Sequence, residues 1–185
     1  MNAKNSLVVS LYGGPCSGKS TTMAGVFAKL KCLGIEAEMT SEFAKEKIWE
    51  NSIDLLNNQI YVFGQQLQSI VRLVGKVDVV VTDSPLLLSI IYGKNEVPEF
   101  KPLVIAVNKR FRMLNFFLRR STPFHHKGRI HNESESKDID QKIELLLSEV
   151  KAPFNYVDVD KDAVMNIVNA TLLELKTISD WSQGI

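Results

Sequence analysis

Residues 13–21 read Gly13-Gly14-Pro15-Cys16-Ser17-Gly18-Lys19-Ser20-Thr21, and this stretch matches the phosphate-loop pattern G-x-x-x-x-G-K-[ST]. The short apolar and β-branched segment 7–12 lies directly before it and predicts a buried parallel strand. The segment that follows has helical spacing, and one face of it carries Met23, Val26, Phe27 and Leu30. Strand, glycine-rich loop and helix in this order make the motif a site, so we expect all of residues 13–21, here called the phosphate loop, to bind a nucleotide.

Each residue type in the phosphate loop has a physical reason. The glycines let successive backbone N–H groups turn inward to form an anion-binding nest. The N-terminus of the following helix adds unpaired donors and its positive dipole end. Lys19 is expected to reach the β- and γ-phosphates of ATP, and the Ser20 hydroxyl to bind Mg²⁺. We interpret Cys16 as a small filler residue rather than as a redox switch.

Length and composition indicate an ordinary globular protein. The 185 residues predict a single domain, residues 1–185, and the formal net charge of +1 gives no overall signal for nucleic acid or membrane. The two cysteines, Cys16 and Cys32, lack metal-site or disulfide spacing and suit a reducing cytoplasm. Residues 1–6 carry no signal-peptide pattern, and no apolar run approaches the roughly 20 residues that span a bilayer. We therefore expect a cytoplasmic protein with no membrane partner; nothing in the sequence specifies an oligomeric state.

The whole chain alternates between predicted strands and predicted helices. This alternation predicts an α/β fold of three layers, in which helices cover both faces of a five-stranded parallel sheet. We expect a loop over 93–102, which holds Pro98 and Pro102, and an N-terminal cap at Ser136 for the helix that follows. The predicted strands are 7–12, 35–39, 77–83, 113–118 and 154–159, and the helices are 22–33, 41–49, 59–74, 86–92, 103–111, 137–150 and 162–175.

Two acidic residues follow predicted strands and are expected at the ligand-binding edge of the sheet. Asp83 is a candidate for holding Mg²⁺ or accepting a proton, and the alternative is a turn-forming Asp-Ser before Pro85. Glu42 is a candidate general base for an acceptor hydroxyl. Its alternative role is an exposed acidic residue that favours a helix dipole. The sequence leaves open which of the two acids is the base.

Basic residues near the fourth strand are candidates for neutralising transferred charge. Arg119, Arg120 and Arg129 all suit bidentate phosphate contacts, and we expect catalytic roles for Arg119 and Arg129. Residues 119–136 resemble a closing lid in composition, and the alternative is a solvated basic loop. The three histidines in that segment lack the fixed spacing of metal ligands.

The predicted helix 59–74 carries the candidates for acceptor binding. Gln59 and Gln66 have the paired donor and acceptor that recognise the edge of a base, and Phe63 has a ring on which a base can stack. The alternative is that Phe63 belongs to the core and the glutamines to the surface.

Several of these stretches together resemble a known family. The sequence is similar to phage-type P-loop kinases and AAA-like ATP-binding proteins related to the nicotinamide riboside kinase domain. Besides the phosphate loop, the residues that carry the resemblance are Ser41-Glu42-Phe43-Ala44-Lys45-Glu46, Asn58-Gln59-Ile60-Tyr61-Val62-Phe63-Gly64-Gln65-Gln66-Leu67, Thr82-Asp83-Ser84-Pro85-Leu86, and Gly128-Arg129 followed by Ile139-Asp140.

The resemblance implies a nucleoside- or nucleotide-kinase fold, ATP with Mg²⁺, and phosphate transfer to a hydroxyl or phosphate of a base-containing acceptor. It implies that Lys19 and Ser20 hold phosphates and Mg²⁺, that Glu42 and Asp83 serve acceptor and metal, and that Arg129 belongs to a lid. Lys45 stands where relatives often have Arg, and Lys does not replace a bidentate contact.

The leading hypothesis is therefore an ATP-dependent kinase that acts on a small nucleoside or nucleotide. The resemblance to phage proteins also implies a competitor acceptor, a 5-hydroxymethylpyrimidine within DNA. A non-catalytic or slowly hydrolysing nucleotide-binding switch is the alternative of another class. A GTPase is disfavoured, because Asn108-Lys109-Arg110-Phe111 lacks the final Asp of a guanine-binding signature.

Overall fold

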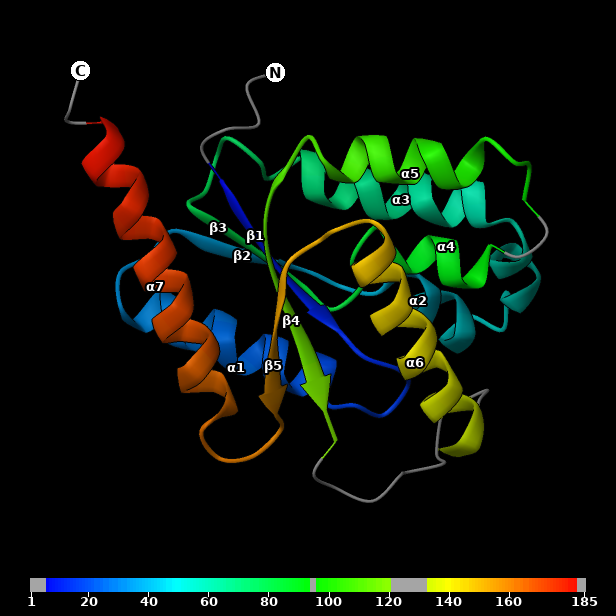
Figure 1. Ribbon diagram of the computed structural model, residues 1–185, viewed down its shortest axis with the longest axis horizontal. Helices are drawn as coiled ribbons and strands as arrows, with labels where there is room; N and C mark the ends of the chain where they lie inside the picture. The colour runs from blue at the N-terminus through cyan, green and yellow to red at the C-terminus, as the bar shows by residue number, and fades with distance from the viewer. Residues whose placement is uncertain (1–5, 94–95, 121–132, 183–185) are drawn as a thin grey trace.

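Five strands form one parallel sheet in the computed structural model, which describes residues 6–93, 96–120 and 133–182 (Figure 1). The strand order is β2-β3-β1-β4-β5, and every neighbouring pair is parallel. This confirms the predicted α/β class and the five-stranded parallel sheet. The strands are β1 (Leu7–Tyr12), β2 (Ala37–Thr40), β3 (Val79–Thr82), β4 (Arg112–Arg119) and β5 (Phe154–Asp158).

Helices cover both faces of the sheet, as expected for a parallel sheet buried on two sides. Helices α1 and α7 lie on one face, and α3, α4, α5 and α6 pack on the other (Figure 1). The helical elements are α1 (Lys19–Cys32), α2 (Phe43–Trp49), the 3₁₀ helix η1 (Ile53–Asn57), α3 (Gln59–Val71), α4 (Leu88–Tyr92), α5 (Phe100–Asn108), α6 (Glu133–Glu149) and α7 (Ala163–Ser182).

The central strand β1 explains why there are three layers. Successive side chains of a strand point to opposite faces, and all six residues of β1 are buried. Leu7, Val9 and Leu11 join the cluster under α1 and α7, whereas Val8 and Tyr12 join the cluster under the helices of the other face. A continuous apolar strand therefore supplies both halves of the core.

The register of the strands brings the candidate site residues to one edge. Thr40 of β2 pairs with Thr82 of β3, and Thr82 pairs with Ser10 of β1. Because these strands run in the same direction, Glu42, Asp83 and the phosphate loop all follow at the carboxyl edge of the sheet. This is the edge at which open α/β sheets bind ligands.

Two helix starts differ from the prediction. Helix α5 begins at Phe100, inside the predicted loop, because Pro102 lies in the first helical turn, where a missing N–H costs no hydrogen bond. Helix α6 begins at Glu133, so Ser136 lies within the helix and is not its cap. Ser136 is fully buried, and its hydroxyl donates to the carbonyl oxygen of Pro15 in the phosphate loop at 2.6 Å.

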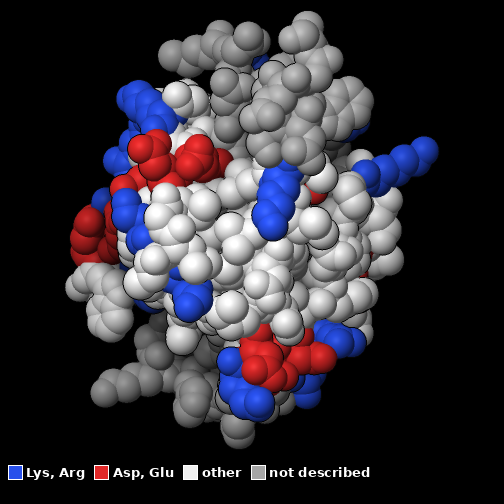
Figure 2. Space-filling model, turned by 90° about the vertical axis from the view of Figure 1, so that its left-hand side faces the viewer, with Lys and Arg blue, Asp and Glu red and all other residues white. Residues whose placement is uncertain are grey.

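Two smaller differences concern residues 51–58 and the last helix. Residues 51–58, which no predicted helix or strand covers, contain η1, and α7 extends to Ser182, beyond the predicted end at residue 175. Among the described residues, no helix has the length and apolar character needed to cross a membrane. The surface in Figure 2 shows Lys and Arg side chains among Asp and Glu side chains, with no continuous basic stripe on that face. This mixture agrees with the net charge of +1.

Candidate active site

The phosphate loop has the backbone that its glycines allow. Gly13 has φ +140° and Gly18 has φ +84°, both in the region that favours glycine. A Cβ on Gly13 would lie 2.5 Å from Ser17 Oγ, and one on Gly18 would lie 2.9 Å from Val159 Cγ1. Cys16 also has a positive φ, +61°, although it is not glycine. Such conformations cost free energy and cluster at functional sites, which agrees with a loop shaped for a ligand.

Lys19 begins helix α1 and bends back over the phosphate loop. Its ammonium donates to the carbonyl oxygens of Gly13 at 2.7 Å and of Gly14 at 2.9 Å. Ser20 follows in the first turn of α1, where the N–H groups at the helix start favour an anion. Ammonium, hydroxyl and helix start thus belong to one short segment.

Asp83 follows β3 directly and is only 2% exposed. Within the part of the chain that the structure describes, its Oδ1 atom is buried and has no hydrogen-bond partner. A buried carboxylate oxygen without a partner is costly, and a cation or a metal-bound water offsets that cost. Carboxylate and hydroxyl oxygens are the ligands that Mg²⁺ prefers, so Asp83 and Ser20 fit the ion. With the glycine loop and Lys19, the residues present also fit the phosphates of ATP.

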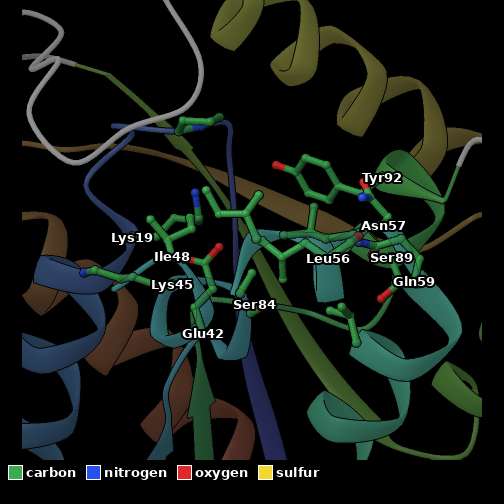
Figure 3. Close-up of a pocket in the computed structure, with 15 residues that line it drawn as sticks. Lys19, Glu42, Lys45, Ile48, Leu56, Asn57, Gln59, Ser84, Ser89 and Tyr92 are labelled. Carbon is green, nitrogen blue, oxygen red and sulfur yellow. The ribbon is translucent and has the colours of Figure 1, made fainter. Parts of the chain in front are cut away.

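A cavity of about 340 Å³ opens beside the phosphate loop (Figure 3). Lys19 and Pro15 bound it on the loop side, and Glu42 projects into it from the end of β2. The lining combines aliphatic side chains with a few polar groups, which is usual for a small-molecule site. The other lining residues are Ala44, Lys45, Ile48, Ile53, Leu56, Asn57, Gln59, Val62, Ser84, Leu88, Ser89 and Tyr92.

Glu42 occupies the N-cap position of α2, but its side chain does not cap that helix. Figure 3 shows its carboxylate and the Lys19 ammonium on the same side of the cavity that both residues line. Its charge also acts on a neighbour: burial, and then the negative charges of Glu42 and Asp140, raise the pKa of Tyr92 to about 12. The Tyr92 hydroxyl is protonated at neutral pH even without this rise, so it offers the cavity a neutral polar group.

The structure separates the three residues expected to bind the acceptor. Gln59 lines the cavity, although its side-chain amide donates to the carbonyl oxygen of Leu56 at 2.8 Å. Phe63 belongs to the core, where its ring meets Phe100 edge to face with centroids 5.9 Å apart. Gln66 is buried, and its amide donates to Thr82 Oγ1 at 3.4 Å. Phe63 and Gln66 are thus not among the residues that line the cavity.

The two adjacent arginines at the end of β4 have different surroundings. Arg119 pairs with Asp158 of β5 at 2.8 Å and lies over the ring of Tyr156, and it is not among the residues that line the cavity. Arg120 instead contacts Ser136 and Asp140 of α6, and these two residues contact the phosphate loop. Arg129, the three histidines and most of the predicted lid 119–136 lie outside the described residues.

Sequence reasoning missed two groups of residues near the site. Asn57, Ser89 and Tyr92 line the cavity. Asn57 lies between two predicted helices, and Ser89 and Tyr92 lie on the predicted short helix 86–92, so none of them carries a site motif. The sequence indicates Asp140 only through the family resemblance, and Ser136 only as a candidate helix cap. The spacing of Ser136 and Asp140, four residues apart on one helix face, is the signal that could have joined them.

A phosphate loop that directly follows the central strand β1 of a parallel sheet is the arrangement of a P-loop fold. The chain belongs to the AAA domain family, whose model matches residues 8–164. The predicted resemblance to P-loop kinase-like proteins is thereby confirmed, and its phage association stays a prediction.

Two solved structures have a similar fold. The first is the NadR protein in complex with NR, with a TM-score of 0.67 and 16% identity over 94% of this chain. This chain spans about half of that protein, 52% of its length. The second is the thymidylate kinase from Ehrlichia chaffeensis, with a TM-score of 0.57 and 12% identity, covering 94% of this chain and 99% of that one. No curated protein sequence matches the chain.

Proposed function

We propose that the protein is an ATP- and Mg²⁺-dependent phosphotransferase that moves the γ-phosphate of ATP to a small nucleoside- or nucleotide-type acceptor. One observation carries the proposal: Lys19 of the phosphate loop and Glu42 at the end of β2 line the same cavity. A carboxylate in a cavity beside the phosphate loop is placed to act on the hydroxyl of an acceptor bound there. The similar folds of NadR and thymidylate kinase support an acceptor of this class.

The residues divide into a donor half and an acceptor half. Residues 13–21 hold the phosphates of ATP, and Lys19 stabilises the negative charge on the transferring group. Ser20 and Asp83 hold Mg²⁺, which neutralises charge on the β- and γ-phosphates when bound. The acceptor occupies the cavity, and Glu42 receives the proton of its hydroxyl as the new oxygen–phosphorus bond forms and ADP leaves. If the acceptor is a phosphate, its attacking oxygen carries no proton, so Glu42 takes none.

A transfer screen with radiolabelled ATP tests the proposal. The screen includes nucleosides, mononucleotides and DNA that contains hydroxymethyluracil. We expect label on a nucleoside or nucleotide, and loss of that label in Glu42→Gln. Label on DNA alone would instead support the kinase of hypermodified bases. ATP binding with no labelled acceptor and slow hydrolysis would support the nucleotide-binding switch.

A further inference from the structure

Helix α6 contacts the phosphate loop through Ser136 and Asp140, which are not among the residues that line the cavity. The Asp140 carboxylate accepts from the backbone N–H of Gly14 at 2.5 Å, and the Ser136 hydroxyl donates to the carbonyl oxygen of Pro15 at 2.6 Å. Arg120, at the end of β4, donates to Ser136 Oγ at 2.6 Å and to Asp140 Oδ2 at 2.5 Å. These bonds, here called the loop–α6 contact, join β4, α6 and the second and third residues of the loop.

The loop–α6 contact is less exposed than the other ion pairs between described residues. The side chains of Arg120 and Asp140 are 14% and 22% exposed. The pair Lys101–Glu149, at the other end of α6, is 43% and 60% exposed. Exposed pairs contribute little to stability, whereas a partly buried charge-assisted bond holds its geometry more firmly. The Arg120–Asp140 pair is therefore suited to fixing a backbone position.

Gly14 gives independent evidence of how closely the two parts meet. The phosphate-loop pattern accepts any residue at this position. A Cβ on Gly14 would nevertheless lie 2.6 Å from the Ser136 carbonyl oxygen and 3.0 Å from the Arg120 guanidinium. The φ of Gly14 is not positive, so its backbone does not require glycine. Glycine is needed at this position because α6 packs against it.

Gly14 is also contacted by Lys19, a residue of the phosphate loop itself. Lys19 donates to the carbonyl oxygen of Gly14, while Asp140 accepts from its N–H. The proposed function requires the Lys19 ammonium to turn to the phosphates of ATP. The bonds from Ser136 and Asp140 do not involve Lys19, so they keep Gly14 and Pro15 in place when it turns.

We propose that Arg120, Ser136 and Asp140 are positioning residues that pre-organise the phosphate loop for the phosphates of ATP. This inference rests on the proposed function, because it assigns the loop to ATP. Without the loop–α6 contact, Gly14 and Pro15 would have to become ordered when ATP binds. The free-energy cost of that ordering would lower the affinity for ATP. None of the three residues needs to touch ATP for this effect.

Equilibrium binding by titration calorimetry tests the inference on the full chain, with Mg²⁺-ATP and with inorganic tripolyphosphate as probes. The variants are Asp140→Ala, Asp140→Asn and Ser136→Ala, and Glu149→Ala on the same helix is the control. We expect Asp140→Ala and Ser136→Ala to weaken both probes about tenfold, as for the loss of a hydrogen bond that orders the loop. Asp140→Asn keeps an acceptor oxygen and is expected to lose less, and Glu149→Ala is expected to bind like the wild type.

Kinetics separate positioning from a general loss of stability. A positioning role raises the KM for ATP in these variants and leaves the KM for the acceptor close to that of the wild type. Unchanged affinity for both probes in folded Ser136→Ala and Asp140→Asn would overturn the inference, even if Asp140→Ala did not fold. A wild-type protein that binds neither probe would overturn the proposed function and this inference with it.

Discussion

Lys19 supplies the only ammonium of the phosphate loop, and its position at the start of α1 lets it reach over the loop. Replacing Lys19 by alanine removes a charge that the proposed transition state needs. We expect Lys19→Ala to lower the transfer rate by about 10²–10³-fold, the usual loss for one such donor. The fold should persist, because the bonds of Lys19 to Gly13 and Gly14 are local to the loop. The measurement is the initial rate of label transfer, with far-ultraviolet circular dichroism as the check on folding.

The matched control for this variant is Lys29→Ala. Lys29 lies in the last turn of the same helix, at the opposite end from the loop. Its replacement removes one favourable interaction with the helix dipole and should leave transfer unchanged. A Lys19→Ala protein with near wild-type turnover would remove Lys19 from the mechanism.

Replacing Asp83 is expected to affect the stability of the protein and its transfer rate differently. Its buried carboxylate has an oxygen without a partner in the described part of the chain, and this costs the folded protein free energy. The amide of Asp83→Asn removes the negative charge and much of that cost. We expect the thermal midpoint of the Mg²⁺-free protein to stay or to rise. We expect the transfer rate to fall about 100-fold, as for a lost metal-site contact.

Asp78→Asn is the control, since Asp78 precedes the same strand at the opposite edge of the sheet and is exposed. Calorimetry gives the midpoint, and the dependence of rate on Mg²⁺ concentration gives the metal affinity. If Asp83→Asn lost thermal stability and kept its rate, Asp83 would have a structural role instead.

The adjacent arginines show why site residues are only partly predictable at this scale. The strand-end rule placed Glu42 correctly at the cavity, because it depends only on the direction of the strands. Choosing between Arg119 and Arg120 requires knowing to which side each side chain of β4 turns, and adjacent strand residues turn to opposite sides. Phe63 presents the same difficulty on α3, since an aromatic side chain suits the core as well as a binding site.

Close packing between helices gives a prediction at the scale of elements. Helices α1 and α7 meet at Gly25, where an added Cβ would lie 2.7 Å from Val164 Cγ2. Val164 packs against the core and has a stiff χ1, so it yields little. We expect Gly25→Ala to lower the free energy of unfolding by about 1–3 kcal/mol through overpacking.

Gly64 is a helical glycine without such a contact. It is exposed on α3, and no heavy atom lies within 4 Å of an added Cβ. We expect Gly64→Ala to raise the free energy of unfolding by about 0.5–1 kcal/mol, because alanine loses less backbone entropy in a helix. Urea denaturation with unchanged m-values measures both variants. Equal effects of the same sign at Gly25 and Gly64 would contradict close α1–α7 packing.

Elements were predictable from the sequence where a local pattern decides them. Val79-Val80-Val81 predicted β3, since a β-branched run suits a strand buried on both faces. The starts of α5 and α6 were not predictable from such a pattern. For α5 the reason is Pro102, because proline in a first turn is compatible with a helix as well as with a loop. Ser136 has the chemistry of a cap, but its partner, Pro15, is distant in the sequence, and no local pattern encodes that contact.

At the scale of the whole molecule, the sheet brings segments together that are distant in the sequence. The molecule does this without a strong net electrostatic field. The phosphate loop, Glu42 and Asp83 lie at one edge of the sheet because the three parallel strands before them end there, and the net charge is only +1. The face in Figure 2 mixes charges of both signs. A protein that follows a DNA backbone instead neutralises several phosphates with Lys and Arg, and its affinity falls steeply with salt. Salt dependence therefore distinguishes the proposed small acceptor from DNA.

We expect the KM for a nucleoside acceptor to change less than about threefold between roughly 50 and 200 mM salt, since binding it releases few counterions. A DNA acceptor held by several phosphate contacts would lose about 10³-fold or more in affinity over the same range. ATP is itself an anion, so its KM is measured at each salt concentration and serves as the internal control. An acceptor KM that rises far more steeply than that of ATP would contradict a small uncharged acceptor, because only a polyanion couples its binding so strongly to salt.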